Sequence, residues 1–140
     1  MSQIQSQQIS NSFIVMLVDD DPMQVDYLAA LLAALGVESM MKSYSGSDAI
    51  FQIENADKKP DLLICDLLMP GMDGFEMMSQ LADKNFTVPI IVISSQNQSV
   101  RKSAAILATI KRLHFLGEVE KPVELAALKV LLEKAIAAKG

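Results

Sequence analysis

The chain has 140 residues, of which 51% are hydrophobic and 21% charged, and this is the size and composition of one globular domain with its own core. Its formal net charge is −5 and no basic stripe occurs, which argues against nucleic-acid binding by this domain. The single Cys65 cannot form an internal disulfide, so a reducing cytoplasmic compartment is expected.

Taken in chain order, the sequence begins with a polar stretch and then alternates between two kinds of segment. Residues 1–12 lack the basic start and the apolar core of a signal peptide, and we interpret them as a disordered tail before a domain at 13–139. No apolar run is long enough to span a bilayer, so no membrane segment is expected. Short apolar runs predict strands at 13–18, 37–44, 61–65, 90–93 and 115–119. Helical periodicity and capping residues predict helices at 22–35, 47–55, 75–82, 99–113 and 123–138.

Five repeats of strand then helix are typical of a doubly wound parallel α/β sheet with right-handed crossovers. Asp21 and Pro22 read as the N-cap and first residue of the first helix, and Gly36 is placed to end it. The strand at 37–44 is the least apolar and is therefore expected nearer an edge.

The helix at 99–113 is predicted to carry an inward apolar side and a solvated basic side. The residues expected to face inward are Val100, Ala104, Leu107 and Ile110. The basic pairs Arg101-Lys102 and Lys111-Arg112 are interpreted as solvated helix faces.

Polar side chains follow four of the predicted strands. Asp19 and Asp20 follow the first strand, Asp66 the third, Ser94 the fourth and Lys121 the fifth. Because chemistry in open parallel sheets gathers at the carboxyl ends of the strands, we expect these side chains to converge on one edge. Three carboxylates close together need a cation between them, and hard oxygen ligands that leave room for water and phosphate suit Mg²⁺. Asp66 would then stay ionised and act as a nucleophile toward phosphorus.

Four segments in this order resemble the receiver domain of two-component response regulators, the CheY-like superfamily. They are LVDDDP at 17–22, ICDLLMPGMDG at 64–74, IVISS at 91–95 and EKP at 120–122, and the resemblance covers 13–138. It implies a flavodoxin-like receiver fold with strand order 2-1-3-4-5.

The resemblance also implies a role for each site residue. Asp66 matches the phosphoacceptor, which takes a phosphoryl group from a histidine kinase or phosphotransfer protein. The metal ligands implied for Mg²⁺ are Asp20, Asp66, the backbone carbonyl of Leu68, and Asp19 through water. Lys121 matches the residue that pairs with the phosphoryl group, and Ser94 matches the switch hydroxyl. Output to a partner domain, or a homodimer, is implied for the surface of the fourth helix, fifth strand and fifth helix.

Three positions depart from the family pattern. Glu118 stands where an aromatic residue is usual, and Phe115 is the only nearby aromatic alternative. Leu68 cannot orient a hydrolytic water, which leaves Gln96 as a candidate for that role. The long interval between Ser94 and Lys121, followed by a Leu-Gly-X-X-X-Lys-Pro segment, resembles receivers fused to cyclic-di-GMP phosphodiesterase domains.

Other classes of function stay open at the level of sequence. A small phosphohydrolase would use the same nucleophile, but it usually needs a carboxylate at the position of Leu68, so no enzyme beyond slow self-dephosphorylation is expected. A flavodoxin-like binding module would need a phosphate-binding loop where Asp19 to Asp21 stand. A receiver used only as a phosphorylation-independent interaction platform also remains an alternative because of Glu118.

Overall fold

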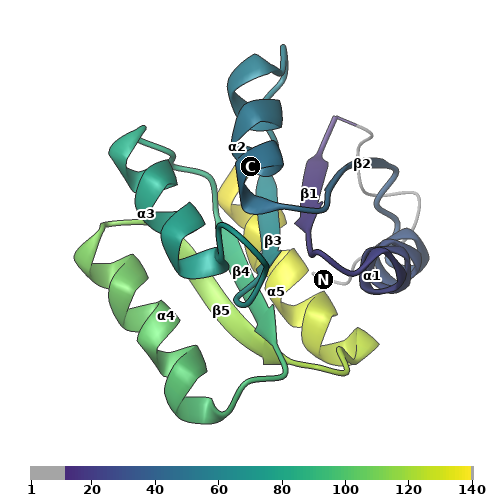
Figure 1. Cartoon of the computed structure of the whole chain (residues 1–140). Helices are drawn as coiled ribbons and strands as arrows, with labels where there is room; N and C mark the ends of the chain where they lie inside the picture. The colour runs from purple at the N-terminus through teal and green to yellow at the C-terminus, as the bar shows by residue number, and fades with distance from the viewer. Residues whose placement is uncertain (1–11, 140) are drawn as a thin grey trace.

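A computed structural model describes residues 12–139 and confirms the predicted alternation of strands and helices (Figure 1). The strands are β1 (Ile14–Val18), β2 (Ser39–Ser43), β3 (Leu62–Asp66), β4 (Ile90–Ser94) and β5 (Phe115–Glu120). The helices are α1 (Pro22–Ala34), α2 (Gly46–Asn55), α3 (Gly74–Asp83), α4 (Gln98–Ile110) and α5 (Leu125–Lys139). All strands pair in parallel in the order β2-β1-β3-β4-β5, which is the expected fold class and strand order. The interpretation of 1–12 as a tail is not tested, because residues 1–11 lie outside the described part of the chain.

Helices cover both faces of the sheet and create two apolar cores. One core joins α1 and α5 to one face, and the other joins α2, α3 and α4 to the opposite face (Figure 1). Because both sides of the inner strands are covered, β3 and β4 are buried along their whole length. β2 lies at an edge, as its weaker apolar character predicted.

Local capping chemistry sets several helix ends as the sequence predicted. The Asp21 carboxylate accepts a hydrogen bond from the Met23 N–H and caps α1. Gly36 follows α1 with a φ of 100°, a left-handed conformation that glycine adopts at little cost. Asp73 also caps α3, because its carboxylate accepts a hydrogen bond from the Glu76 N–H, and this cap was not predicted from the sequence.

The fourth helix differs from its predicted form at its C-terminal end. α4 stops at Ile110, and Arg112 follows with a φ of 61°. Ala104 and Ala108 are buried, whereas the Ile110 side chain is 69% exposed. At 3.6 residues per turn, Ile110 lies about 120° around the helix from Ala104, so the two cannot share one buried face.

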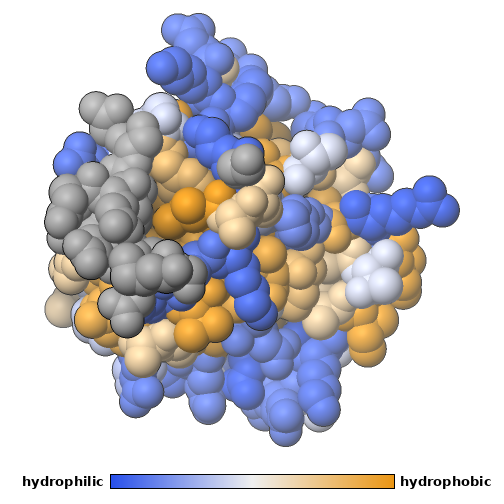
Figure 2. Space-filling model, turned by 180° about the vertical axis from the view of Figure 1, so that it is seen from behind, coloured by the Kyte–Doolittle hydropathy of each residue, from blue (hydrophilic) through white to orange (hydrophobic). Residues whose placement is uncertain are grey.

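The ends of the described chain meet at the amino-terminal edge of the sheet. The Asp61 carboxylate accepts a hydrogen bond from the Ile14 N–H at 2.7 Å and pairs with Lys139 Nζ at 3.2 Å. On the coloured part of the face seen from behind, hydrophobic residues gather across the middle of the molecule and are interrupted by hydrophilic ones (Figure 2). No helix within residues 12–139 combines the length and apolar character needed to cross a bilayer.

Candidate functional site at the carboxyl edge of the sheet

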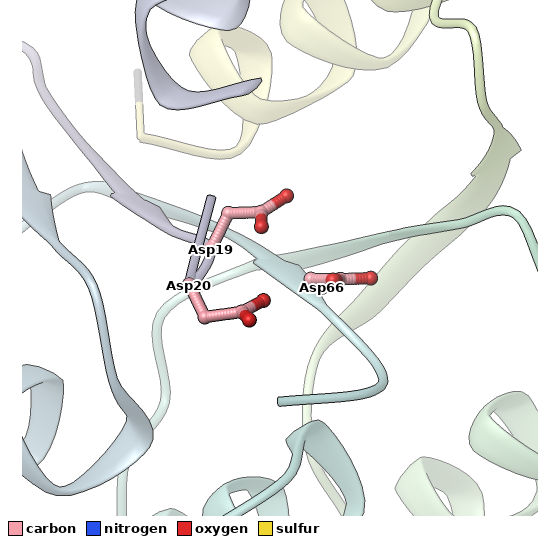
Figure 3. A group of neighbouring side chains, drawn as sticks. All are labelled: Asp19, Asp20 and Asp66. Carbon is pink, nitrogen blue, oxygen red and sulfur yellow. The ribbon is translucent and has the colours of Figure 1, made fainter. Parts of the chain in front are cut away.

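Three carboxylates meet at the carboxyl edge of the sheet. Asp19 and Asp20 directly follow β1, and Asp66 is the last residue of β3. Their side chains reach toward the same space (Figure 3), and one oxygen from each lies within 4.8 Å of the others. β1 and β3 are neighbours with Val18 paired to Cys65, so the parallel register brings the next residues of each strand together.

Lys121 completes this cluster from the end of β5. Its ammonium nitrogen donates a hydrogen bond to Asp19 Oδ2 at 2.9 Å and lies 3.4 Å from Asp66 Oδ2. The Lys121 backbone N–H donates to the carbonyl of Ser94 at 3.0 Å, which ties the last residue of β4 to the same position. The structure thus brings the candidate residues from β1, β3, β4 and β5 to one edge.

The three carboxylates differ in exposure and in how many hydrogen bonds their oxygens accept from the rest of the protein. Asp19 is 1% exposed, and its Oδ1 accepts the Asp21 N–H at 3.0 Å while its Oδ2 accepts from Lys121. Asp66 is 7% exposed and accepts the Leu67 N–H at 2.8 Å. Asp20, in contrast, is exposed to solvent. A cation entering from solvent therefore meets Asp20 and Asp66 more readily than Asp19.

Burial and mutual repulsion shift the protonation of this cluster. Burial and then the nearby Asp19 charge raise the pKa of the Asp66 carboxyl, although Lys121 and the Leu67 N–H act in the opposite direction. Burial alone would lower the pKa of Lys121, but its contacts with Asp19 and Asp66 outweigh that effect and raise the pKa. Burial, followed by the neighbouring Asp66 charge, raises the pKa of the Cys65 thiol to about 12. Cys65 is therefore an inert core residue, as its position in an apolar strand predicted.

The loop after Asp66 is held against the strand by a glycine. A Cβ on Gly74 would overlap the Asp66 carbonyl oxygen and lie 2.9 Å from Leu67 Cα, so only glycine fits there. The Gly74 N–H also donates to the Leu67 carbonyl at 2.7 Å. Gly71 has a φ of 77° and serves the turn itself. Between them these glycines shape the loop that carries Leu68, whose side chain is 47% exposed.

The donor set fits a hard divalent cation. Three carboxylates face a single ammonium group, so the cluster carries excess negative charge that a cation would neutralise. Carboxylate and carbonyl oxygens in small number, open to solvent on the Asp20 side, match the preference of Mg²⁺ for a shell completed by water and phosphate oxygens. Asp19, Asp20 and Asp66 each offer one carboxylate oxygen that could hold it.

The interpretation of Arg101 as part of a solvated helix face is wrong. Its side chain is 12% exposed and its Nη1 donates to the Gln96 carbonyl at 3.0 Å. Its guanidinium also lies near Glu118 and Glu120 on β5, at 3.9 Å and 3.7 Å. Glu118 lies on the predicted strand at 115–119 and Glu120 directly follows it, and two acidic residues spaced two apart are a signal that a cation packs there. The sequence did not indicate which basic residue supplies that cation.

Phe115 does not replace the aromatic residue missing at Glu118. The register pairs Phe115 with Ile90 at the start of β4, whereas Glu118 pairs with Val92 and Glu120 with Ser94. Phe115 packs into the core shared by α2, α3 and α4, at the opposite end of the strand from the site.

The fold and this edge define a class of protein. Residues 15–133 match the family model described as the response regulator receiver domain, so the chain belongs to that family of two-component signalling proteins.

Two relatives that agree with this class are longer than the chain. The transcriptional regulatory protein ZraR of Salmonella typhimurium is 32% identical over 123 residues, which cover 88% of this chain and 26% of ZraR. The cyclic di-GMP phosphodiesterase RocR of Pseudomonas aeruginosa is 28% identical over 125 residues, covering 89% of this chain and 31% of RocR. The chain therefore spans about a quarter to a third of these relatives.

A solved structure shows the same fold. The CheX–CheY–BeF₃–Mg complex from Borrelia burgdorferi superposes with a TM-score of 0.76 at 22% identity, covering 89% of each chain.

Proposed function

We propose that this domain accepts a phosphoryl group on Asp66 from a histidine kinase or a phosphotransfer protein and passes its state to a partner or output domain. The observation that carries the proposal is the position of Lys121 Nζ, 2.9 Å from Asp19 and 3.4 Å from Asp66, beside a carboxylate cluster open to solvent through Asp20. Family membership supports the same reading.

The chemistry follows from the arrangement of charges. One oxygen of Asp66 forms a bond to phosphorus while the bond from phosphorus to the donor's histidine nitrogen breaks, and that nitrogen takes a proton from solvent. Mg²⁺, when bound by Asp20, Asp66 and the Leu68 carbonyl, with Asp19 acting through water, neutralises charge on the phosphoryl oxygens. Lys121 already lies between Asp19 and Asp66, so it supplies a second positive charge without rearrangement.

Ser94 connects this chemistry to a change of conformation. Its hydroxyl oxygen accepts the Gln96 N–H at 2.9 Å and is buried at the end of β4. In the proposed switch the hydroxyl turns toward a phosphoryl oxygen and gives up this contact, which shifts the loop into α4. Phosphorylation biases an existing equilibrium between the two loop conformations.

The domain acts as a switch, with self-dephosphorylation as its only turnover. Leu68 stands two positions after Asp66 and supplies no second carboxylate for acid–base catalysis on a free substrate. Mg²⁺ is the cofactor, the cytoplasm is the compartment, and the surface of α4, β5 and α5 is the route to an output domain or a homodimer. RocR, similar over its receiver-like part, is a phosphodiesterase by name, so such an output domain is one option for a longer chain.

The test is incubation with a small phosphodonor and Mg²⁺, read by the intact mass of the protein. We expect one phosphoryl adduct that is absent in Asp66→Asn and absent with a chelator. An Asp21→Asn variant is the matched control, because Asp21 caps α1 and should leave the adduct in place. No adduct in the folded parent would favour an interaction platform, and many turnovers on the free donor would favour a phosphohydrolase.

A further inference from the structure

We propose that Arg101 is a positioning residue that couples the Ser94–Gln96 loop to the two glutamates on β5, so that the state of Asp66 sets how strongly Glu118 and Glu120 are neutralised. The inference rests on the proposed function, because it takes phosphorylation of Asp66 as the event that moves the loop. The contacts that join α4 to β5 in this inference are those of Arg101 with Glu118 and Glu120.

The first step is the placement of the guanidinium group. Arg101 belongs to the first turns of α4, and its side chain is 12% exposed. Its Nη1 donates a hydrogen bond to the Gln96 carbonyl at 3.0 Å, which is a bond to the loop before the helix. The same side chain reaches Glu118 Oε1 at 3.9 Å and Glu120 Oε2 at 3.7 Å. A planar group with five donors can serve a loop carbonyl and two carboxylates at once.

The second step is the contact that Gln96 makes on its other side. The Gln96 N–H donates to Ser94 Oγ at 2.9 Å, while the Gln96 carbonyl accepts from Arg101. One residue therefore joins the buried hydroxyl at the site to the cation on α4. When the hydroxyl turns to a phosphoryl oxygen, Gln96 loses a hydrogen bond and its backbone is free to move.

The third step is the effect on β5. Glu118 and Glu120 face α4 and pair in register with Val92 and Ser94. Glu120 is 68% exposed and Glu118 26% exposed, so the strength of their contacts with Arg101 governs how much negative charge this edge presents. Both contacts are long for ion pairs and partly screened by solvent, so a small displacement of Arg101 is enough to weaken them. The two glutamates also line an open groove with Glu124 and Val130, where that charge is accessible to a partner.

The experiment follows the side-chain carboxyl carbons of Glu118 and Glu120 by NMR in the full chain labelled with ¹³C. Beryllofluoride with Mg²⁺ serves as the stable mimic of the phosphoryl group. The Arg101→Met variant provides the reference, because it shows the carboxyl signals of Glu118 and Glu120 when the Arg101 guanidinium is absent. We expect the mimic to move the parent signals toward the Arg101→Met values, and the response in Arg101→Met to fall to about half or less of the parent response.

The matched control is Lys102→Met, which removes an exposed cation from the next position of the same helix and should respond like the parent. Arg101→Lys keeps the charge without the planar fork, so an intermediate response is expected. Intact mass after treatment with a phosphodonor reports separately on Asp66. An adduct with carboxyl signals that do not move in the parent would overturn the coupling alone. No adduct in the parent would overturn the proposed function and the coupling with it. If Arg101→Met does not fold, the Arg101→Lys variant decides the question: a response smaller than that of the parent supports the coupling, and a response equal to that of the parent overturns it.

Discussion

Lys121 Nζ lies 2.9 Å from Asp19 Oδ2 although 102 positions separate the two residues in the chain. Asp19 is almost fully buried, and Lys121 is the only basic side chain among residues 12–139 with an ion pair to it. This contact joins the ends of β1 and β5 on either side of Asp66. Its loss should therefore affect both the stability of the fold and the chemistry of the site.

Lys121→Met is expected to lower the stability of the metal-free protein by about 1–3 kcal/mol, because it leaves two buried carboxylates without their cation. Added Mg²⁺ should recover part of this loss by supplying positive charge to the same oxygens. Urea unfolding at neutral pH with a chelator, and again with MgCl₂, measures both effects. Lys58→Met, on an exposed turn, is the control. Equal losses in the two conditions would contradict a shared cation site.

Asp66→Asn is expected to stabilise the metal-free protein at neutral pH. The folded state raises the pKa of Asp66, so the stability linked to its protonated form is present below the ordinary carboxyl pKa. That stability is lost as the pH rises through the folded pKa, and above it the ionised group opposes folding. The difference in urea midpoint between variant and parent should therefore grow from acidic to neutral pH. A difference that shrinks over this range would show that burial, with the added repulsion by Asp19, does not govern the ionisation of Asp66.

Gly74→Ala is expected to cost about 1–3 kcal/mol, because its Cβ would overlap the backbone of Asp66 and Leu67, which cannot move as a flexible side chain does. The shift should also slow phosphorylation at Asp66. Chemical unfolding and the rate of adduct formation by intact mass test the two parts. Gly71→Asn is the matched change in the same loop, since no heavy atom lies within 4 Å of a Cβ there and asparagine tolerates a positive φ. Equal losses in the two variants would argue against the close contact as the cause.

Gln96→Ala is expected to slow loss of the phosphoryl group from Asp66 several-fold. The side chain of Gln96 stands two positions beyond Ser94 and is the candidate for orienting the attacking water, because Leu68 has no polar atom in its side chain. The backbone contacts of Gln96 with Ser94 and Arg101 do not depend on its side chain. Decay of the adduct by intact mass measures the rate, with exposed Gln98→Ala as the control. An unchanged rate would remove Gln96 from this role.

The sequence alone predicted the elements whose signals are local. Periodicity, and caps such as Asp21 and Gly36, depend on residues within one or two turns of each other, so the strands, helices and most of their ends follow from short segments. The acids at the carboxyl ends of β1 and β3 were predicted to approach one another because parallel strands end at a common edge.

Tertiary structure decided which side chains lose contact with water. Ile110 is exposed although it fits an apolar stripe, and Arg101 is covered although it adjoins an exposed lysine on α4. The helical repeat of about 3.6 residues is compatible with more than one buried face. Only the packing of α4 against β5 determines which face of α4 is buried. The pairing of Arg101 with Glu118, like that of Lys121 with Asp19, joins residues from separate elements. Such contacts depend on how the elements pack, and no short segment of the chain encodes them.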